Sequence, residues 1–322
     1  INPEQFEKDY KKGISYYGLK KDVQYCKSCV ISNQRPNSEL EYKHTSQTKK
    51  RTIIFDDNLC QACQFAKTKK QDIDWKAREK QLRDLCDKYR SNDGSYDCIV
   101  PGSGGKDSFF TSHMLQNKYG MNPLSITWAP NMYTPWGIKN MENWVNSGID
   151  NTLLSPNRRV QRLLTRLSVE NLLHPFQAFQ FGQKYLAPRI AMRHNVELIF
   201  YGEHSSEYGN NLEESKTPIM NEDYFINDDV DSLFVGGVSH ADLKSKFGLR
   251  DIDLKHYKPL TTKEIDDSKI QVHYFGFYEP WHPQGNYYYS VEHGGFITSP
   301  ERLSGTYTKY SSIDDKMEEF NY

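Results

Sequence analysis

Short apolar runs alternate with longer amphipathic segments along most of the chain. Apolar runs bounded by turn residues are typical of buried strands, whereas apolar residues at every third or fourth position are typical of helices. We predict strands over residues 96–100, 123–128, 151–154, 197–201 and 271–278. Helices are predicted over residues 74–89, 109–119, 136–145, 160–173 and 180–194.

This alternation predicts an α/β fold in which helices cover both faces of a parallel sheet. Ligands of such sheets bind beyond the carboxyl ends of the strands. The loops that follow Val100, Trp128, Leu154 and Tyr201 are therefore the places where we expect a functional site.

The loop after Val100 carries the strongest functional signal. It reads Pro101-Gly102-Ser103-Gly104-Gly105-Lys106-Asp107-Ser108 and joins a predicted strand to a predicted helix. A helix N-terminus presents free N–H groups and the positive end of the helix dipole, and glycines let the backbone wrap closely around an anion. Lys106 adds a mobile positive charge, so we predict that this loop binds phosphate groups.

Two better-known glycine-rich loops do not fit this sequence. The mononucleotide P-loop places Ser or Thr after its lysine, but Asp107 follows Lys106 here. A nucleophile elbow centred on Ser103 would need glycine in place of Pro101. What remains is a phosphate cradle of another class or a glycine-rich surface turn. The strand before the loop and the helix after it favour the cradle.

Two C-x-x-C pairs stand near the N-terminus, Cys26 with Cys29 and Cys60 with Cys63. Each pair can place two thiolates on one metal ion, and two pairs complete the tetrahedral site that structural zinc prefers. Such a site would stabilise a small module that lacks a sufficient core of its own. The alternatives are four buried free cysteines or redox pairs.

Composition narrows the class of protein. The chain has 322 residues, enough for about two domains, and its 41 basic and 42 acidic residues give a net charge of -1. Without a basic excess, nucleic acid is not expected as a partner. No apolar run approaches the roughly 18 residues of a membrane span, and the polar N-terminus is not a signal peptide. We therefore expect a cytoplasmic protein, and the initial Ile1 in place of Met suggests that the natural chain begins earlier.

Further candidate residues follow the fourth predicted strand and lie near the end of the chain. Glu203 and Glu207 could bind Mg²⁺ or polarise a substrate, the alternative being a solvated acidic loop. The aromatic stretch at residues 281–296, with His282 and His293, could line a sugar pocket, although such histidines more often make ordinary polar contacts.

Several of these motifs resemble a known family when they are taken in order. Residues 103–108 resemble the SGGxDS loop of the PP-loop ATP pyrophosphatases, which cleave ATP to AMP and pyrophosphate. From about residue 25 to its end, the chain resembles the N-acetyl sugar amidotransferases. The matching motifs are both cysteine pairs, the glycine-rich loop, Tyr201-Gly202-Glu203, Trp281-His282-Pro283-Gln284 and Tyr307-Thr308-Lys309-Tyr310-Ser311-Ser312-Ile313-Asp314-Asp315-Lys316.

The resemblance implies an enzyme of bacterial surface-polysaccharide, lipopolysaccharide and flagellar-glycan synthesis. Such an enzyme uses ATP and Mg²⁺ to convert an acetamido group of a nucleotide-activated sugar to an acetamidino group through an O-adenylyl imidate. It releases AMP and pyrophosphate. The resemblance also implies a partner glutaminase subunit and a barrel subunit that channels ammonia. Members of this family continue beyond the position that corresponds to Tyr322.

The same resemblance implies roles for individual residues. Lys106, Asp107 and Glu203 would be catalytic, with Asp107 near Mg²⁺ and Trp128 beside the adenine. The ATP-binding residues would be Ser103, Gly104, Gly105, Lys106, Asp107, Ser108, Trp128, Lys309 and Lys316. The structural Zn²⁺ ligands would be Cys26, Cys29, Cys60 and Cys63.

We expect five segments along the chain. They are an N-terminal extension at 1–21 with a short helix at 3–12, a zinc module at 22–73, a PP-loop core at 74–212, a helical insertion at 213–269 with a helix at 239–247, and the end of the core with a substrate-binding segment at 270–322.

Two other functions stay open. Some tRNA-thiolating PP-loop enzymes also carry zinc knuckles, but such an enzyme needs a sulfur-carrying cysteine or an iron–sulfur cluster near the loop. Cys86 and Cys98 fall in a predicted helix and strand, where we expect small core residues. A non-catalytic, zinc-stapled adaptor would bind ATP without forming AMP, and the intact Lys106-Asp107 pair argues against it.

Overall fold

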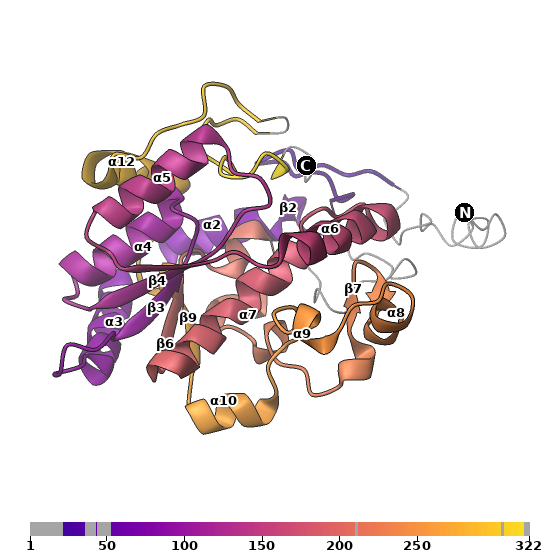
Figure 1. The fold of residues 1–322 in the computed structure, drawn as a ribbon. Coiled ribbons are helices and arrows are strands. Elements are labelled where there is room, and N and C mark those ends of the chain that lie inside the picture. Colours follow the sequence, from indigo (N-terminus) through magenta and orange to yellow (C-terminus); the bar gives the residue numbers. More distant parts are fainter. Residues whose placement is uncertain (1–21, 36–42, 44–52, 210–211, 304–305, 319–322) are drawn as a thin grey trace.

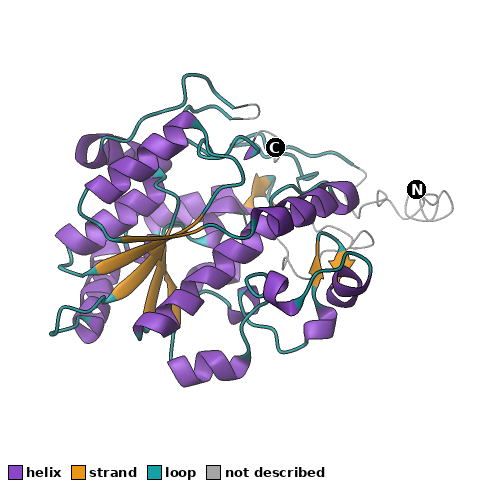
Figure 2. Ribbon diagram, in the orientation of Figure 1, coloured by secondary structure: helices purple, strands orange, loops and turns teal. Residues whose placement is uncertain are grey.

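The structure is a computed structural model that describes residues 22–35, 43, 53–209, 212–303 and 306–318. The predicted N-terminal extension at residues 1–21 and its helix lie outside the described residues. Within them, a small N-terminal module and a long insertion accompany a central sheet that is enclosed by helices (Figure 1, Figure 2).

Five parallel strands form the central sheet, in the order β5-β4-β3-β6-β9. Side chains of its inner strands, such as Ile99 and Phe200, have no exposed surface because both faces of the sheet are covered. The predicted α/β fold with a parallel sheet is therefore confirmed. The strands are β3 Cys98–Pro101, β4 Pro123–Trp128, β5 Asn151–Leu154, β6 Leu198–Tyr201 and β9 Gln271–Tyr274.

Helices pack on both faces of the sheet. α4 Lys106–Asn117 and α7 Gln177–His194 contact β3, β4 and β6 from opposite sides (Figure 1). α7 comes close because it carries Gly182, where a Cβ would lie 2.1 Å from Trp128 Cε2. The other helices around the sheet are α3 Trp75–Tyr89, α5 Pro135–Asn146, α6 Arg158–Leu172, α11 Phe275–Tyr278 and α12 Pro283–Gly294.

The fifth strand is shorter than its sequence predicts. β9 ends at Tyr274, and the rest of the predicted strand forms α11. A short apolar run does not distinguish a strand from a buried helix. Here the Gly276 N–H donates to the Gly202 carbonyl at 2.7 Å, which turns the chain across the end of β6.

α12 is a helix that the hydrophobic pattern does not predict, because its sequence is crowded with tyrosines. Its start is nevertheless well built. Pro283 stands in the first turn, where proline is tolerated, and His282 Nδ1 accepts the Gly285 N–H at 3.1 Å. His282 thus serves as the N-cap of α12.

The insertion between β6 and β9 consists of short elements, of which β7 packs against α6 (Figure 1). Its predicted helix is present as α8, capped by Ser239 Oγ, which accepts the Asp242 N–H at 3.2 Å. The boundaries predicted for the five segments of the chain, those of the insertion at 213–269 included, stay a prediction. The elements are 3₁₀ turns at Ser205–Tyr208, Leu212–Lys216, Glu222–Tyr224 and Val230–Ser232, the hairpin β7 Phe234–Val235 and β8 Val238–Ser239, and helices α8 His240–Ser245, α9 Asp251–Leu254 and α10 Thr262–Ser268.

The N-terminal module has a small core of its own. Cys26, Ile53 and Cys60 are buried together, apart from the main core. The hairpin of β1 Phe55–Asp56 and β2 Leu59–Cys60 leads directly into α2 Gln61–Gln71. No helix in the described ranges is long and apolar enough to cross a membrane.

Candidate nucleotide site

The glycine-rich loop lies where the connectivity of the sheet reverses. β3 stands between β4 and β6, and the chain runs outward from β3 to β5 before it crosses back to β6. Loops that leave neighbouring strands at such a point diverge and make room for a ligand. The loop after Pro101 and the loop that starts at Gly202 therefore flank one crevice.

Glycine lets this loop pass very close to α4 and α5. Gly104 has φ +85°, and a Cβ there would lie 2.8 Å from Met141 Cα of α5. A Cβ on Gly102 would lie 2.1 Å from Ser108 Cβ of α4. Gly105 caps α4 without any side-chain acceptor for the first turn. The backbone N–H groups at this helix start are thus suited to bind an anion.

A cavity of about 270 Å³ opens beside the loop. Its walls come from the loop and the start of α4, from α5 and α7, from the end of β6, and from the segment that follows α12. The structure brings to it these sequence-predicted residues: Ser103, Gly104, Gly105, Lys106, Asp107, Ser108 and Glu203.

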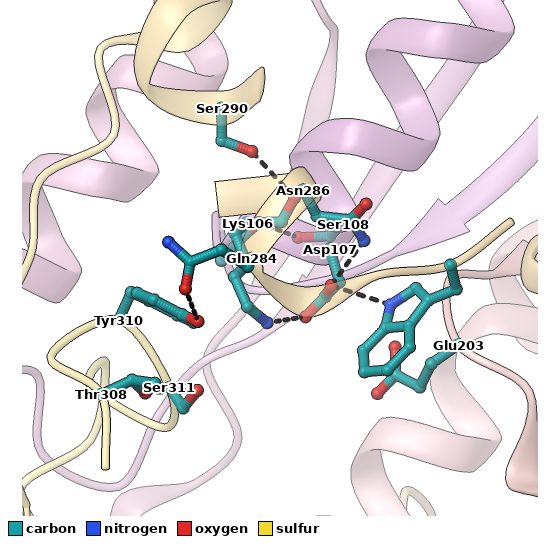
Figure 3. A network of polar contacts seen from close by, with 12 residues as sticks. Lys106, Asp107, Ser108, Glu203, Gln284, Asn286, Ser290, Thr308, Tyr310 and Ser311 are labelled. Carbon is teal, nitrogen blue, oxygen red and sulfur yellow. Dashed lines mark hydrogen bonds and ion pairs between the residues drawn. The ribbon is translucent and has the colours of Figure 1, made fainter. Parts of the chain in front are cut away.

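Lys106 and Asp107 are held in place by α12 and the segment before it (Figure 3). The Lys106 ammonium contacts Asp107 Oδ2. The other carboxylate oxygen, Oδ1, accepts the Trp281 Nε1–H and an Asn286 Nδ2–H, each at 2.9 Å. Ser290 Oγ donates to the Lys106 carbonyl at 2.9 Å. Both oxygens of Asp107 therefore have partners within the protein, and the first turn of α4 is fixed to α12.

Aromatic rings enclose the Lys106 ammonium. Lys106 Nζ lies 5.9 Å from the ring centre of Trp281 and 5.8 Å from that of Tyr310, within the range of cation–π attraction. Tyr310 stacks on Tyr287 and donates its hydroxyl to Gln284 Oε1 at 2.7 Å. Lys106 is the one cationic side chain among the described residues that line the cavity.

Carboxyl groups make the cavity acidic, since Asp107, Glu203, Asp314, Asp315 and Glu318 all line it. Burial raises the pKa of Glu203, and the charge of Asp107 adds to this effect. Burial also raises the pKa of Asp314. Burial, with the charges of Asp314 and Asp315, raises the pKa of Glu318 to about 8. A polyanion entering this cavity needs added cations or protons to offset the like charges.

The C-terminal acidic residues reach the cavity because their segment pairs with the loop after β4. Asp315 Oδ2 accepts the Asn131 N–H at 2.5 Å, and Asp315 Oδ1 accepts the Met132 N–H at 3.2 Å. Thr134 Oγ1 donates to the Ile313 carbonyl at 2.6 Å. The chain end thereby closes one side of the site.

Three predicted ATP contacts are not brought to the cavity. Trp128 is 3% exposed, and its indole packs against Gly182 and Tyr257 in the core. An indole buried behind α7 has no free face for an adenine. Lys309 donates to the Pro300 carbonyl at 2.6 Å and Lys316 is exposed, and neither of them lines the cavity.

The two histidines of the aromatic stretch also lie outside the cavity lining. His282 caps α12, as described above. His293 stacks on His113 with ring centres 5.4 Å apart, and His113 Nδ1 lies 2.8 Å from the Tyr289 hydroxyl. Both histidines therefore have structural partners.

The four N-terminal cysteines meet as predicted, with all sulfur atoms within 4.8 Å of one another. Zn–S bonds of about 2.3 Å in a tetrahedron place sulfur atoms about 3.8 Å apart, which fits this arrangement. The N–H groups of Ser28 and Cys60 donate to Cys26 Sγ, each at 3.4 Å. Burial raises the pKa of Cys26, but backbone hydrogen bonds outweigh it and lower the pKa to about 6. The cluster can thus hold one metal ion.

Cys86 and Cys98 are buried in the main core, with no exposed surface, and neither lines the cavity. Desolvation raises the pKa of Cys86 to about 12 and raises that of Cys98. The prediction that they are core residues is confirmed.

Sequence reasoning misses several residues that build the site. Asn286 lies outside the motifs given above, Tyr310 lies in a motif without a recognisable chemical pattern, and Glu318 lies beyond the last motif. The adjacent acidic residues Asp314 and Asp315 are a signal that could have located the acidic wall.

Comparison with known proteins gives distant likenesses. No family model matches the chain. An uncharacterized protein of Methanocaldococcus jannaschii is 30% identical over 83 residues, which cover 26% of this chain and 29% of that protein.

Three solved structures show a weak likeness to the fold. A predicted subunit of tRNA methyltransferase from M. jannaschii has a TM-score of 0.34 at 16% identity, covering 69% of this chain and 83% of that one. The U34-tRNA thiolase of Methanococcus maripaludis with its [4Fe-4S] cluster scores 0.32 at 12% identity, covering 90% and 78%. The NMN synthetase of Francisella tularensis scores 0.31 at 13% identity, covering 72% and 100%. Likenesses of this size do not establish a shared activity.

Proposed function

We propose that this chain is a PP-loop ATP pyrophosphatase that activates the acetamido group of a nucleotide-linked sugar for attack by ammonia. The observation that carries the ATP part is the glycine-rich loop with Lys106 at the switch point of the sheet, open to a cavity of about 270 Å³. Backbone N–H groups and one lysine at that place suit the β- and γ-phosphates that leave as pyrophosphate.

The proposed reaction begins when the acetamido carbonyl oxygen attacks the α-phosphorus of ATP. An O–P bond forms as the bond to pyrophosphate breaks, and the product is an O-adenylyl imidate. Ammonia then adds to the imidate carbon, and AMP leaves with the former carbonyl oxygen. An acetamido group, ATP and ammonia thus become an acetamidino group, AMP and pyrophosphate.

The residues of the cavity have defined tasks in this reaction. The loop and Lys106 stabilise the charge that develops on pyrophosphate, which is the electrostatic part of the catalysis. Asp107, Glu203 and Asp314 offer the carboxylate oxygens that Mg²⁺ prefers, and Mg²⁺ bound there would neutralise phosphate charge. Zn²⁺ would be held by the four cysteines, whose spacing suits it, in a closed structural site.

The sugar part of the proposal is supported by the way distant motifs converge on one site. Trp281 donates to Asp107, and Gln284 accepts from Tyr310, so the motifs at 281–284 and 307–316 meet the glycine-rich loop. Glu203, from a third motif, lines the same cavity. These are the motifs on which the resemblance to N-acetyl sugar amidotransferases rests.

Free ammonia is scarce at neutral pH because most of it is protonated. We therefore propose that a partner glutaminase supplies it through a barrel-shaped subunit, as the resemblance implies. The two cysteines outside the module are buried in the core, so neither is a candidate glutaminase nucleophile.

The proposal is tested by incubating the protein with ATP, Mg²⁺, ammonium at raised pH and a panel of acetamido sugar nucleotides. We expect AMP, pyrophosphate and a sugar nucleotide in which NH has replaced O, detected by mass spectrometry. Formation of ADP and phosphate would contradict the mechanism.

A tRNA-thiolating enzyme is the second candidate, favoured by the four-thiol cluster, since tetrahedral sulfur sites hold either zinc or iron–sulfur centres. Against it, no described cysteine lines the cavity. Elemental analysis tests the form of this candidate that uses an iron–sulfur cluster: iron and sulfide in the purified protein would favour it, and their absence would remove that form. Full activity of Cys86→Ala and Cys98→Ala variants would remove a sulfur-carrying role for either residue.

A further inference from the structure

Lys69, near the end of α2, makes two polar contacts from the helix that follows the cysteine cluster to segments beside the nucleotide site. Its ammonium donates to Glu207 Oε1 at 2.6 Å and to the Trp281 carbonyl at 2.7 Å. The side chains of Lys69 and Glu207 are only 15% and 8% exposed. A nearly buried ion pair with a second hydrogen bond defines the position of both partners.

Trp281 and the turn that carries Glu207 each contact a carboxylate of the cavity. The indole of Trp281 donates to Asp107 Oδ1 at 2.9 Å. Glu207 stands in the 3₁₀ turn Ser205–Tyr208, whose Tyr208 donates its hydroxyl to Glu203 Oε1 at 3.0 Å. The Lys69 ammonium therefore holds the Trp281 backbone, whose indole binds Asp107, and the turn whose Tyr208 binds Glu203.

The other end of α2 is tied to the cysteine cluster. Cys60 is the residue before α2, and Cys63 lies in its first turn. A helix of 11 residues thus connects two of the four thiols to Lys69. Because a helix is rigid over this length, the placement of the cluster restricts where the backbone of Lys69 lies.

We propose that Lys69 is a positioning residue of the nucleotide site, through which the cysteine module holds Asp107 by way of Trp281. The role of Asp107 in this inference rests on the proposed function. The contacts from Lys69 to Trp281 and from Trp281 to Asp107 do not depend on that function. When Lys69 is lost, Trp281 gives up its anchor, and Asp107 loses one of the two N–H donors that keep Oδ1 turned away from Lys106.

The first test reads the indole itself. Protein labelled with ¹⁵N at tryptophan gives one N–H resonance for each indole, and Trp281→Phe identifies that of Trp281. In Lys69→Met we expect this resonance to shift and its hydrogen exchange to accelerate. In Lys70→Met, a change of the exposed lysine next along α2, both should match the unaltered protein. An unchanged Trp281 resonance in Lys69→Met would overturn the coupling, whatever the enzyme's reaction proves to be.

The second test measures the affinity for pyrophosphate with Mg²⁺ by calorimetry. Trp281→Phe should weaken binding about tenfold, the value of a hydrogen bond to a charged group, and Lys69→Met should weaken it about threefold to tenfold. Lys69→Arg should recover most of the affinity. The double variant should bind no worse than Trp281→Phe alone, because both changes act through the same indole. Equal affinity of Lys69→Met and the unaltered protein, or full additivity in the double variant, would overturn the proposal.

Two controls keep the outcomes distinct. Loss of Lys69 leaves Glu207 buried without its cation, and burial already raises the pKa of Glu207. If Lys69→Met does not fold, the double variant Lys69→Met/Glu207→Gln takes its place in both tests, because it leaves no unpaired buried charge. If the unaltered protein binds no pyrophosphate, the proposed function fails, and the indole measurement still decides whether Lys69 positions Trp281.

Discussion

Gly104→Ala tests whether the path of the glycine-rich loop depends on its contact with α5. Gly104 has φ +85°, a conformation that costs a residue with a Cβ about 1–2 kcal/mol. Its Cβ would also lie 2.8 Å from Met141 Cα and 2.9 Å from Met141 N. Backbone atoms cannot yield as a flexible side chain can, so overpacking adds about 1–3 kcal/mol. We expect Gly104→Ala to lower the free energy of unfolding by about 2–5 kcal/mol in total.

Two other glycines provide matched controls for this change. Gly94 has φ +83° with no atom within 4 Å of its Cβ position, so Gly94→Ala should cost only the conformational part, about 1–2 kcal/mol. Gly105 has φ -67°, and the nearest atom to its Cβ position is Ser103 Oγ at 3.7 Å. Gly105→Ala should therefore fold with nearly unchanged stability.

The assay is urea unfolding followed by circular dichroism, together with the affinity for pyrophosphate in the presence of Mg²⁺. We expect Gly104→Ala to lose more stability than Gly94→Ala and to lose most of its pyrophosphate affinity. Gly94→Ala should bind pyrophosphate normally, since its turn is outside the cavity lining. If Gly104→Ala is as stable as Gly94→Ala and binds pyrophosphate like the unaltered protein, the close approach to α5 does not shape the loop.

Three further predictions concern charges and thiols. Lys106→Ala should abolish AMP release while circular dichroism shows an intact fold, because Asp107 keeps two N–H donors. Retained AMP release, or gross unfolding, would contradict the role assigned to Lys106. Cys26→Ser should lose bound zinc by elemental analysis, whereas Cys86→Ser should retain it; equal zinc in the two variants would place the metal elsewhere. Glu318, whose pKa rises from 4.5 to about 8 on folding, should destabilise the protein progressively as pH increases from 4.5 to 8, since the unfolded state ionises first. Urea unfolding of Glu318→Gln should show a smaller loss of stability between pH 5 and pH 9 than the unaltered protein, and parallel pH curves would refute this linkage.

Much of the sheet can be predicted from the sequence because its strands are buried on both faces. A strand such as β6, Leu198–Tyr201, is then an uninterrupted apolar run, and the glycines after β3 predict a phosphate-binding loop. The cysteine cluster is equally predictable, since two C-x-x-C pairs leave few other arrangements. The shortening of β9 cannot be predicted in the same way, because the turn depends on a hydrogen bond from Gly276 to the Gly202 carbonyl, 74 positions away along the chain.

The inner surface of the site is harder to predict than the fold. Trp128 stands at the end of a strand, where ligands bind, but Gly182 on α7 admits its indole into the core. Gly182 has no side chain at the place that the Trp128 indole fills, and such a match between distant residues leaves no local pattern in the sequence. The acidic wall likewise depends on Asp315 bonding to the loop after β4, which sequence periodicity does not encode.

We propose that the acetamido oxygen is the atom that the glycine-rich loop helps to activate. An acetamido sugar nucleotide labelled with ¹⁸O in its acetyl carbonyl tests it directly, in a reaction with ATP, Mg²⁺ and ammonium. We expect the label to appear in the phosphate of AMP and the acetamidino product to carry none. Label that stays on the sugar while ATP is consumed, or label-free AMP, would contradict it.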